Sequence, residues 1–386
     1  HTRLQGDCSS DVCSSDLLSG VAATPDSVKK LIALGASVAV EAGAGLSASV
    51  TDEAYTAAGA SVGDLAATLS GADLIIKVQR PEAGEVASYP EGATLVAILS
   101  PYADTGLLES YNSRKLNTFA LEFVPRITRA QVMDVLSSQS NLAGYRAVLE
   151  AAHAYGKALP MMMTAAGTVP PAKVLVMGAG VAGLQAIATA KRLGAVVSAT
   201  DVRLAAKEQV ESLGGKFVMV DDEEARQAET SGGYAKEMSD AYKAKQAQLI
   251  ADTIKNQDIV ITTALIPGRK APVLVTEEMV KTMKPGSIII DMAAEQGGNC
   301  ALTKPGQTNE VGGVKILGLL NIPSRIAADA SALYARNLVA FITPLVDKET
   351  KALKPDYADE IVKATNLTQG GKTVHPNFAP KEGAAA

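Results

Sequence analysis

The chain contains no tryptophan, and aromatic residues make up only 4% of its 386 positions. Single-stranded nucleic acids are held by aromatic side chains that stack on bases, and nucleic acids in general by basic surfaces. The formal net charge is −5, so the sequence argues against nucleic acid as a partner. No apolar run approaches the roughly 18 residues that a membrane-spanning helix requires. We therefore expect no such helix in this chain.

Cysteine and histidine are equally scarce, with three of each. Cys8, Cys13 and Cys300 include no CxxC pair, so neither a disulfide framework nor a zinc site is predicted. The three histidines lie far apart in the sequence, which argues against a histidine-based metal site or catalytic triad. We expect no metal, and we expect a reducing, cytoplasmic setting.

Residues 1–20 differ in character from the rest of the chain. They contain the near-repeat CSSDVCSSD and two of the three cysteines. They lack the basic start, the long apolar stretch and the small-residue cleavage site of a signal peptide. We interpret them as a cloning, sequencing or gene-prediction artefact, joined to a genuine chain that resumes near Val21. They are left out of the fold prediction.

The remainder has a globular composition, with 47% hydrophobic residues, and its length predicts two domains. Short apolar stretches alternate with segments of helical spacing, which predicts parallel sheets covered on both faces. We expect an α/β protein of two doubly wound Rossmann-like domains with an interdomain cleft. One domain comprises 1–136 and 329–386, and the other 137–328. The predicted strands are 37–41, 74–78, 94–99, 173–177, 196–200, 258–263, 287–291 and 314–317. The main predicted helices begin near Pro25 with Ser27 as the cap, and span 141–155, 184–194 and 328–342.

A glycine-rich turn follows one of these strands. Residues 178–183, GAGVAG, fit GxGxxG between a predicted strand and a predicted helix. In dinucleotide-binding folds the glycines permit the tight turn, the approach of a pyrophosphate and close helix packing. Asp201 ends the next strand, where a carboxylate bonds the adenosine ribose and repels a 2′-phosphate, so NAD is favoured over NADP. The alternative is an ordinary turn with Asp201 as a strand-end cap. Arg203 either flanks the adenine or is a solvated arginine.

A polar cluster lies in residues 125–146, PRITRAQVMDVLSSQSNLAGYR. Arg, Gln, Asp and Ser side chains there could supply both the donor and the acceptor that a nicotinamide carboxamide requires. The alternative is an interdomain connection with helix-capping serines. The side chains concerned are Arg126, Gln131, Asp134, Ser137 and Ser138.

Two loops are further candidates. Residues 262–268, TTALIPG, follow a predicted strand at the edge where doubly wound folds bind ligands, although an ordinary Pro-Gly turn is equally compatible. Residues 221–238 form a polar excursion around Gly233 and Tyr234. This excursion is either a mobile loop that closes over a cofactor or a solvated insertion.

From Val21 onward the sequence resembles the NAD(H)-binding component of proton-translocating NAD(P) transhydrogenases. The resemblance rests on long contiguous segments: PRITRAQVMDVLSSQSNLAGYRAV, MMMTAAGTVPPAKVLVMGAGVAGLQAIATAKRLGA, TDVR with KEQVESLGGKF, and ITTALIPG. One departure is that Gly20 precedes Val21, where the family has a basic strand leading to an arginine. We therefore expect the first domain to lack an edge or central strand.

The resemblance implies roles for individual residues. Arg126, Gln131 and Asp134 match the family's loop that positions the nicotinamide, and Ser137 and Tyr145 match neighbouring positions on the nicotinamide side. Tyr234 matches the tyrosine of the family's mobile loop. The positions that we expect to bind the cofactor are Gly178, Ala179, Gly180, Val181, Asp201, Val202, Arg203, Gly233, Tyr234, Thr263, Ala264 and Leu265.

The resemblance also implies an assembly. The family's component is a homodimer, binds a separate NADP(H)-binding component, and passes hydride directly between NAD(H) and NADP(H). A membrane proton-channel component couples this to proton translocation. The implied location is cytoplasmic, peripheral on the cytoplasmic face of the inner membrane through the partner subunits.

Alanine dehydrogenase, which shares this fold and fingerprint, is an alternative. It needs a lysine and a histidine near its substrate for acid–base work. Lys77 in KVQRP matches the lysine, but LVAILSPYAD has Ser100 and no histidine. The dehydrogenase is therefore disfavoured, and Lys77 is interpreted as a structural relic or an interdomain ion pair. A non-catalytic NAD(H)-binding module is the other alternative.

Overall fold

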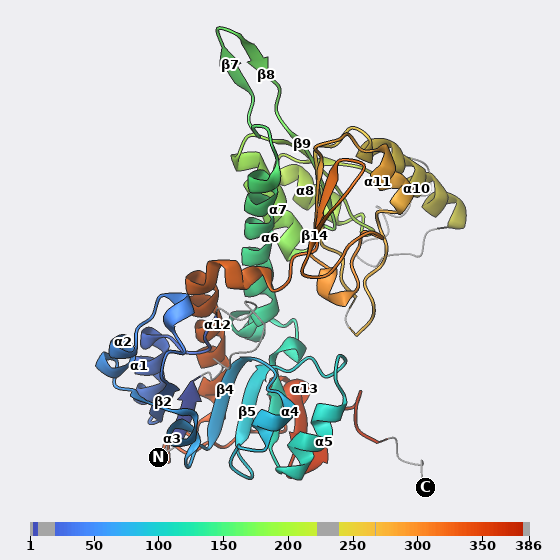
Figure 1. The fold of residues 1–386 in the computed structure, drawn as a ribbon. Helices are drawn as coiled ribbons and strands as arrows, with labels where there is room; N and C mark the ends of the chain where they lie inside the picture. The colour runs from blue at the N-terminus through green and yellow to red at the C-terminus, as the bar shows by residue number, and fades with distance from the viewer. Residues whose placement is uncertain (1–2, 7–19, 222–238, 267, 381–386) are drawn as a thin grey trace. The chain divides into compact units, whose positions relative to one another are not determined.

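The computed structural model describes residues 3–6, 20–221, 239–266 and 268–380. The chain forms two compact units (Figure 1). The terminal unit contains His1–Gln139 and Ser324–Ala386, and the central unit contains Ser140–Pro323. Helix α6 (Val135–Ala154) and the 3-10 helix η5 (Ile322–Ile326) cross the two boundaries.

The terminal unit is built on one eight-stranded sheet. In spatial order its strands are β17 (Lys372–Thr373), β16 (Asn366–Gln369), β6 (Asn117–Ala120), β5 (Thr94–Ile98), β4 (Leu74–Gln79), β1 (Arg3–Gly6), β2 (Ser37–Glu41) and β3 (Ser61–Gly63). Strands β1 to β6 are parallel, and β16 and β17 continue the sheet antiparallel beside β6. The order 3-2-1-4-5-6 of the parallel strands is that of a doubly wound fold.

The expectation that this unit lacks a strand is wrong. Arg3–Gly6 forms β1 in the middle of the sheet, with Leu4 in register with Val38 of β2 and with Leu74 of β4. Ladder hydrogen bonds come from backbone groups, so a gap between two strands accepts an extended segment largely irrespective of its side chains. The interpretation of residues 1–20 as wholly outside the fold therefore fails for these four residues.

Helices and short 3-10 turns surround this sheet. They are α1 (Pro25–Ala33), η1 (Leu46–Ala48), α2 (Asp52–Ala57), α3 (Leu65–Leu69), α4 (Ala83–Val86), α5 (Gly106–Ser113), η2 (Leu121–Phe123), η3 (Thr128–Met133), α12 (Ala327–Ile342), η6 (Thr343–Leu345) and α13 (Glu360–Thr365). Helix α1 begins one residue after Thr24, which caps it, rather than at Ser27 as predicted. Ser27 instead donates back to Thr24 and completes a capping box.

The central unit carries a seven-stranded sheet. In spatial order its strands are β11 (Lys216–Phe217), β10 (Val196–Thr200), β9 (Lys173–Met177), β12 (Ile259–Thr262), β13 (Ile288–Asp291), β15 (Val314–Leu317) and β14 (Thr308–Val311). All neighbouring pairs are parallel except β14 with β15. The chain turns to one side of β9 through β10 and to the other through β12, so the switch point lies between β9 and β12.

The helices described in this unit are α7 (Val181–Arg192), α8 (Ala206–Ser212), α10 (Asp240–Ile254), α11 (Glu277–Thr282) and the 3-10 helix η4 (Ala294–Gln296). A separate hairpin of β7 (Met162–Thr164) and β8 (Gly167–Val169) extends away from the rest of the central unit (Figure 1). The prediction of a two-domain α/β protein with mostly parallel sheets is confirmed. Among the helices of the described ranges, none is long and apolar enough to cross a membrane.

Both sheets are buried on both faces, which explains their continuous apolar strand sequences. In β9 of the central unit, Val174 and Val176 face one hydrophobic cluster and Leu175 faces another. In β4 of the terminal unit, Leu74 and Ile75 divide between two clusters in the same way. The strands are therefore held centrally and rigidly, and the residues that follow their carboxyl ends have defined positions.

Candidate functional site

The glycine-rich turn lies at the switch point, between β9 and α7. Gly178 has a φ of +108°, and a Cβ atom there would lie 2.4 Å from Thr263 Oγ1. A Cβ atom on Gly183 would lie 1.8 Å from the carbonyl oxygen of Gly178, so only glycine lets α7 approach the turn this closely. By contrast, a Cβ atom on Gly180 would meet nothing within 4 Å.

The first turn of α7 has backbone donors available at this open position. Gly180 is its N-cap and, having no side chain, makes no capping hydrogen bond. Unpaired N–H groups and the positive end of the helix dipole attract anionic groups. Val181, the first residue of α7, is exposed beside them. The turn therefore has the open surface and the donors that a pyrophosphate requires.

Asp201 faces this turn from the end of β10. Its Oδ2 accepts from Ala179 N at 2.7 Å, and its Oδ1 accepts from Arg203 N at 2.8 Å and Arg203 Nε at 2.9 Å. Burial opposes ionisation, but these hydrogen bonds outweigh it and lower the pKa of Asp201. The carboxylate is thus ionised at neutral pH. The Asp201 side chain is 7% exposed and that of Arg203 52%, so the arginine lies on the solvent side. Val202, between them, is 87% exposed.

The loop after β12 lies beside the turn. Thr263 N donates to Met177 O at 3.0 Å, and Thr263 Oγ1 donates to Gly178 O at 3.1 Å. Ala264 is half-buried and Leu265 is exposed. The structure therefore brings the glycine turn, Asp201 and the β12 loop together along one edge of the central sheet.

The polar loop of residues 126–134 belongs to the terminal unit. Arg126 and Gln131 are exposed, and their side chains make no hydrogen bond or ion pair with any residue that the structure describes. Between them Ala130 is buried, as is Met133 just beyond, which ties the backbone into the core. The loop thus presents two free polar side chains on a fixed backbone.

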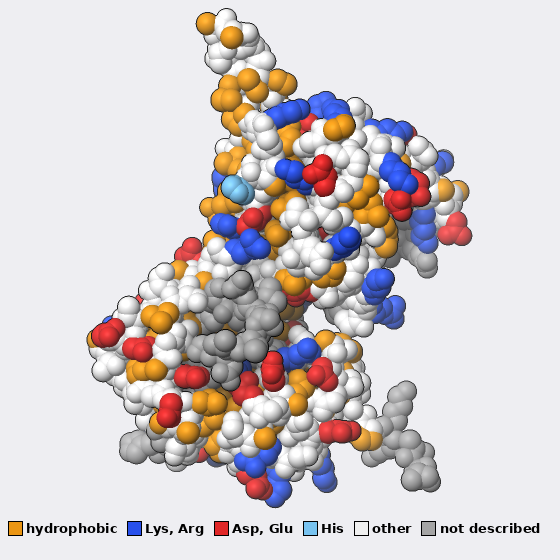
Figure 2. All heavy atoms as spheres, viewed as in Figure 1, with side chains coloured by type: hydrophobic (Ala, Val, Ile, Leu, Met, Phe, Trp, Pro, Cys, Tyr) orange, Lys and Arg blue, Asp and Glu red, His pale blue; other side chains and the backbone are white. Residues whose placement is uncertain are grey.

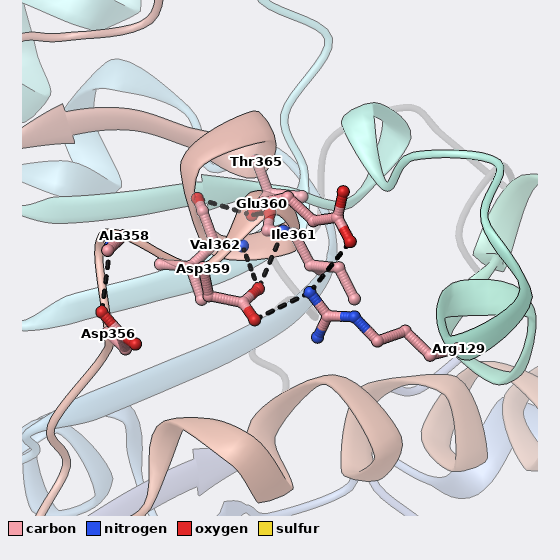
Figure 3. Close-up of polar contacts among 8 residues, drawn as sticks. All are labelled: Arg129, Asp356, Ala358, Asp359, Glu360, Ile361, Val362 and Thr365. Carbon is pink, nitrogen blue, oxygen red and sulfur yellow. Dashed lines mark hydrogen bonds and ion pairs between the residues drawn. The ribbon is translucent and has the colours of Figure 1, made fainter.

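Two anchors, neither predicted from the sequence, hold this loop. Arg129 Nη2 lies 2.7 Å from Asp359 Oδ2 and 3.3 Å from Glu360 Oε1, at the start of α13 (Figure 3). Asp359 also accepts from Ile361 N, so it caps α13 and binds the loop at once. Partial burial would raise the pKa of Asp359, but its hydrogen bonds lower it. The partners are some 230 positions apart, beyond the reach of motif reading.

The second anchor is Asn337 of α12. Its Nδ2 donates to Val132 O at 2.8 Å, and its Oδ1 accepts from Ser138 Oγ at 2.8 Å. Asn337 is buried, so its amide fixes the end of the loop and the start of α6 in a water-poor environment. An asparagine on a predicted helix gives no sequence signal of this role.

Asp134 and Ser137 form a local pair. Asp134 Oδ1 accepts from Ser137 N at 2.9 Å, and Oδ2 accepts from Ser137 Oγ at 2.6 Å. Asp134 therefore caps α6, which begins at Val135 rather than at the predicted Asn141. Tyr145 lies further along α6, is 38% exposed and belongs to the central unit. Gly233 and Tyr234 lie outside the described residues.

Lys77 is engaged within the terminal unit. Its Nζ lies 2.5 Å from Glu85 Oε1, which also accepts from the Tyr89 hydroxyl at 2.7 Å. The pair joins β4 to α4 of one unit, so the proposed interdomain ion pair is wrong. Ser100, where a dehydrogenase requires histidine, donates its backbone N–H to the buried Glu122 carboxyl. In the portion of the chain that is described, no group of three or more His, Cys, Asp or Glu side chains could hold a metal.

These observations define a class: a two-unit Rossmann-type α/β protein with a glycine fingerprint at the switch point and a carboxylate at the end of the next strand. The alanine dehydrogenase/PNT N-terminal domain matches residues 19–143, and the alanine dehydrogenase/PNT C-terminal domain matches residues 147–376. The chain belongs to this family, and within it to the branch of the NAD(P) transhydrogenase alpha subunits, as their separately encoded NAD(H)-binding portion.

Individual relatives support that placement. The chain is 59% identical to the first of the separately encoded portions of NAD(P) transhydrogenase subunit alpha from Rhodospirillum rubrum, over 362 residues that cover 92% of this chain and 94% of the relative. The solved transhydrogenase of Sinorhizobium meliloti is 55% identical, with a TM-score of 0.88, and the match covers 96% of this chain and 100% of that one. An alanine dehydrogenase of Halomonas elongata is more distant, at 30% identity over 92% of this chain and 91% of the relative.

Proposed function

We propose that the chain binds NAD(H) and exchanges hydride directly with NADP(H) held by a separate component of a proton-translocating transhydrogenase. The observation that carries the proposal is the combination at the central sheet edge of an open glycine turn with the ionised Asp201. Asp201 suits the two ribose hydroxyls of NAD(H) and repels a 2′-phosphate. The similarity to transhydrogenase subunits supplies the reaction class.

The residues present fit this cofactor along its length. The open face at Gly180 has room for a pyrophosphate, whose charge the N-terminus of α7 would stabilise. When bound, the dihydronicotinamide supplies the hydride. Arg126 and Gln131 offer free donors and an acceptor for its carboxamide, and Asp134 and Ser137 lie at the end of the same loop.

Direct hydride exchange between two nicotinamides needs orientation rather than acid–base chemistry. The reacting atoms must lie roughly 3–3.5 Å apart, which a fixed loop can enforce. Neither described histidine suits an amino-acid dehydrogenase: His153 is exposed on α6, and His375 stacks against Phe123. Lys77, the lysine of the dehydrogenase alternative, is already paired with Glu85. These features favour transhydrogenation over alanine oxidation.

The test is hydride transfer between two proteins. We expect the chain, mixed with the NADP(H)-binding component of a transhydrogenase, to reduce thio-NADP⁺ with NADH, and neither protein alone to do so. Deuterium at the transferring position of NADH should appear in the product and not in water. A chain that binds NADH and never transfers hydride would be a binding module. A chain that oxidises alanine by itself would be a dehydrogenase.

We further propose that the chain is a homodimer and that the β7–β8 hairpin lies in the dimer contact. Met161, Met162 and Met163 are exposed by 59%, 44% and 78%, and hydrophobic side chains run along the hairpin (Figure 2). No charged residue occurs between Lys157 and Lys173. An uncharged, methionine-rich projection suits burial against another apolar surface.

Replacing the three methionines by glutamine should dissociate the dimer. Partial burial of three methionines contributes about 3 kcal/mol, so the dimer dissociation constant should rise about 100-fold. Sedimentation velocity over a micromolar concentration series measures it. The matched control is Val273→Gln, an exposed apolar position elsewhere in the central unit. A strictly monomeric wild type would refute the dimer, and a hairpin variant as dimeric as the control would refute the role of the hairpin.

A further inference from the structure

Asn299 is a fully buried asparagine of the central unit whose side chain binds backbone on either side of the loop after β12. Its Oδ1 accepts from Ala264 N at 3.0 Å, and its Nδ2 donates to Ala264 O at 2.9 Å and to Pro272 O at 2.8 Å. The amide thus pairs with Ala264 as a neighbouring strand would. It fixes the chain where it leaves β12 and where it returns.

Asn299 is itself held by a buried carboxylate. Asp291, at the end of β13, is fully buried and accepts from Thr262 Oγ1 at 3.1 Å and from Cys300 N at 2.9 Å. Gly298 has a φ of +79°, and a Cβ atom there would lie 2.8 Å from Asp291 Oδ2. The turn before Asn299 therefore folds directly onto Asp291. The carboxylate connects the end of β12 with the asparagine that clamps the loop after it.

The strand order assigns this loop to one half of the cofactor, a step that rests on the proposed function. A dinucleotide whose pyrophosphate lies over the turn at Gly178 extends along the sheet edge in both directions. Asp201, on β10, lies on one side of β9 and takes the adenosine ribose. Ala264 follows β12 on the opposite side, so it faces the nicotinamide half.

We propose that Asn299 is a positioning residue for the nicotinamide half of NAD(H). It acts through the backbone of Ala264 and leaves the adenosine half to Asp201. Removing its side chain frees three buried hydrogen-bonding groups and lets the loop move. A misplacement of about 1 Å in an active site can cost on the order of 100-fold.

The variants are Asn299→Ala, which removes the clamp, and Asn299→Asp, which is isosteric, keeps the acceptor for Ala264 N and repels the two carbonyls. Asn309→Ala is the matched control, because Asn309 Nδ2 donates only to the backbone oxygen of Leu302, in the same unit. NADH affinity is measured by NADH fluorescence, AMP affinity by calorimetry, and folding by thermal denaturation.

Both Asn299 variants should weaken NADH about 10-fold or more and leave AMP within about twofold of wild type. The control should change neither. Equal weakening of NADH and AMP, or no weakening of NADH in a folded variant, would overturn the proposal. A wild type that binds neither ligand would instead refute the proposed function.

A measurement on the wild type keeps the question open to test even if both variants misfold. NADH should slow amide hydrogen exchange of the segment 259–266, whereas AMP should not. Equal protection of this segment by AMP, or none by NADH, would contradict the assignment of Ala264 to the nicotinamide half.

Discussion

Gln131→Asn is expected to slow hydride transfer by on the order of 100-fold and to weaken NADH binding much less. The substitution keeps the amide and shortens its reach by one methylene, and a misplacement of that size can cost this much in rate. The backbone of the loop should not move, because Arg129 and Asn337 anchor it. Contacts of the adenosine and pyrophosphate at Gly180 and Asp201 remain.

The measurement is stopped-flow transhydrogenation with the NADP(H)-binding component, beside NADH titration of the same variant. Gln248→Asn on α10 is the matched control, since it makes the same change at an exposed position of the central unit. Loss of NADH affinity in proportion to rate would assign Gln131 to binding alone. An unchanged rate would remove it from the site.

Asp201→Ala is expected to weaken NADH by about 10- to 100-fold and to abolish discrimination against NADPH. Hydrogen bonds to a charged group contribute about 1.5–3 kcal/mol, which sets the loss of NADH affinity. The substitution also frees the exposed Arg203, whose side chain now pairs with Asp201 and could then meet a 2′-phosphate. The cofactor preference should therefore shift toward NADPH.

Parallel titrations with NADH and NADPH measure this effect. Asp252→Asn is the control, because it removes an exposed carboxylate that pairs with Lys255 on α10. The lowered pKa of Asp201 adds a sign: affinity for NADH should stay level from neutral pH through the ordinary aspartate range and fall only below it. Tighter binding of NADPH than of NADH by the wild type would refute the assignment of Asp201.

Much of the fold is predictable from local sequence. The strand predicted at 173–177 has its observed bounds, and the helix predicted at 328–342 begins at Ala327. Such strands are buried on both faces and are therefore continuously apolar. The helix start at Val135 is missed, because the cap at Asp134 lies before the apolar spacing becomes regular.

By itself the sequence determined the two-unit α/β architecture, the glycine turn before α7 and the placement of Asp201 at the end of β10. These features depend on residues that are close in the chain. Only the tertiary structure decided that Arg3–Gly6 fills the centre of a sheet, that Arg129 reaches Asp359, and that Asn299 clamps Ala264. Each of these depends on backbone groups or polar side chains that are distant in sequence. A backbone ladder is nearly indifferent to side-chain identity, and an asparagine or arginine acquires its role only from the partner that packing brings within hydrogen-bonding distance.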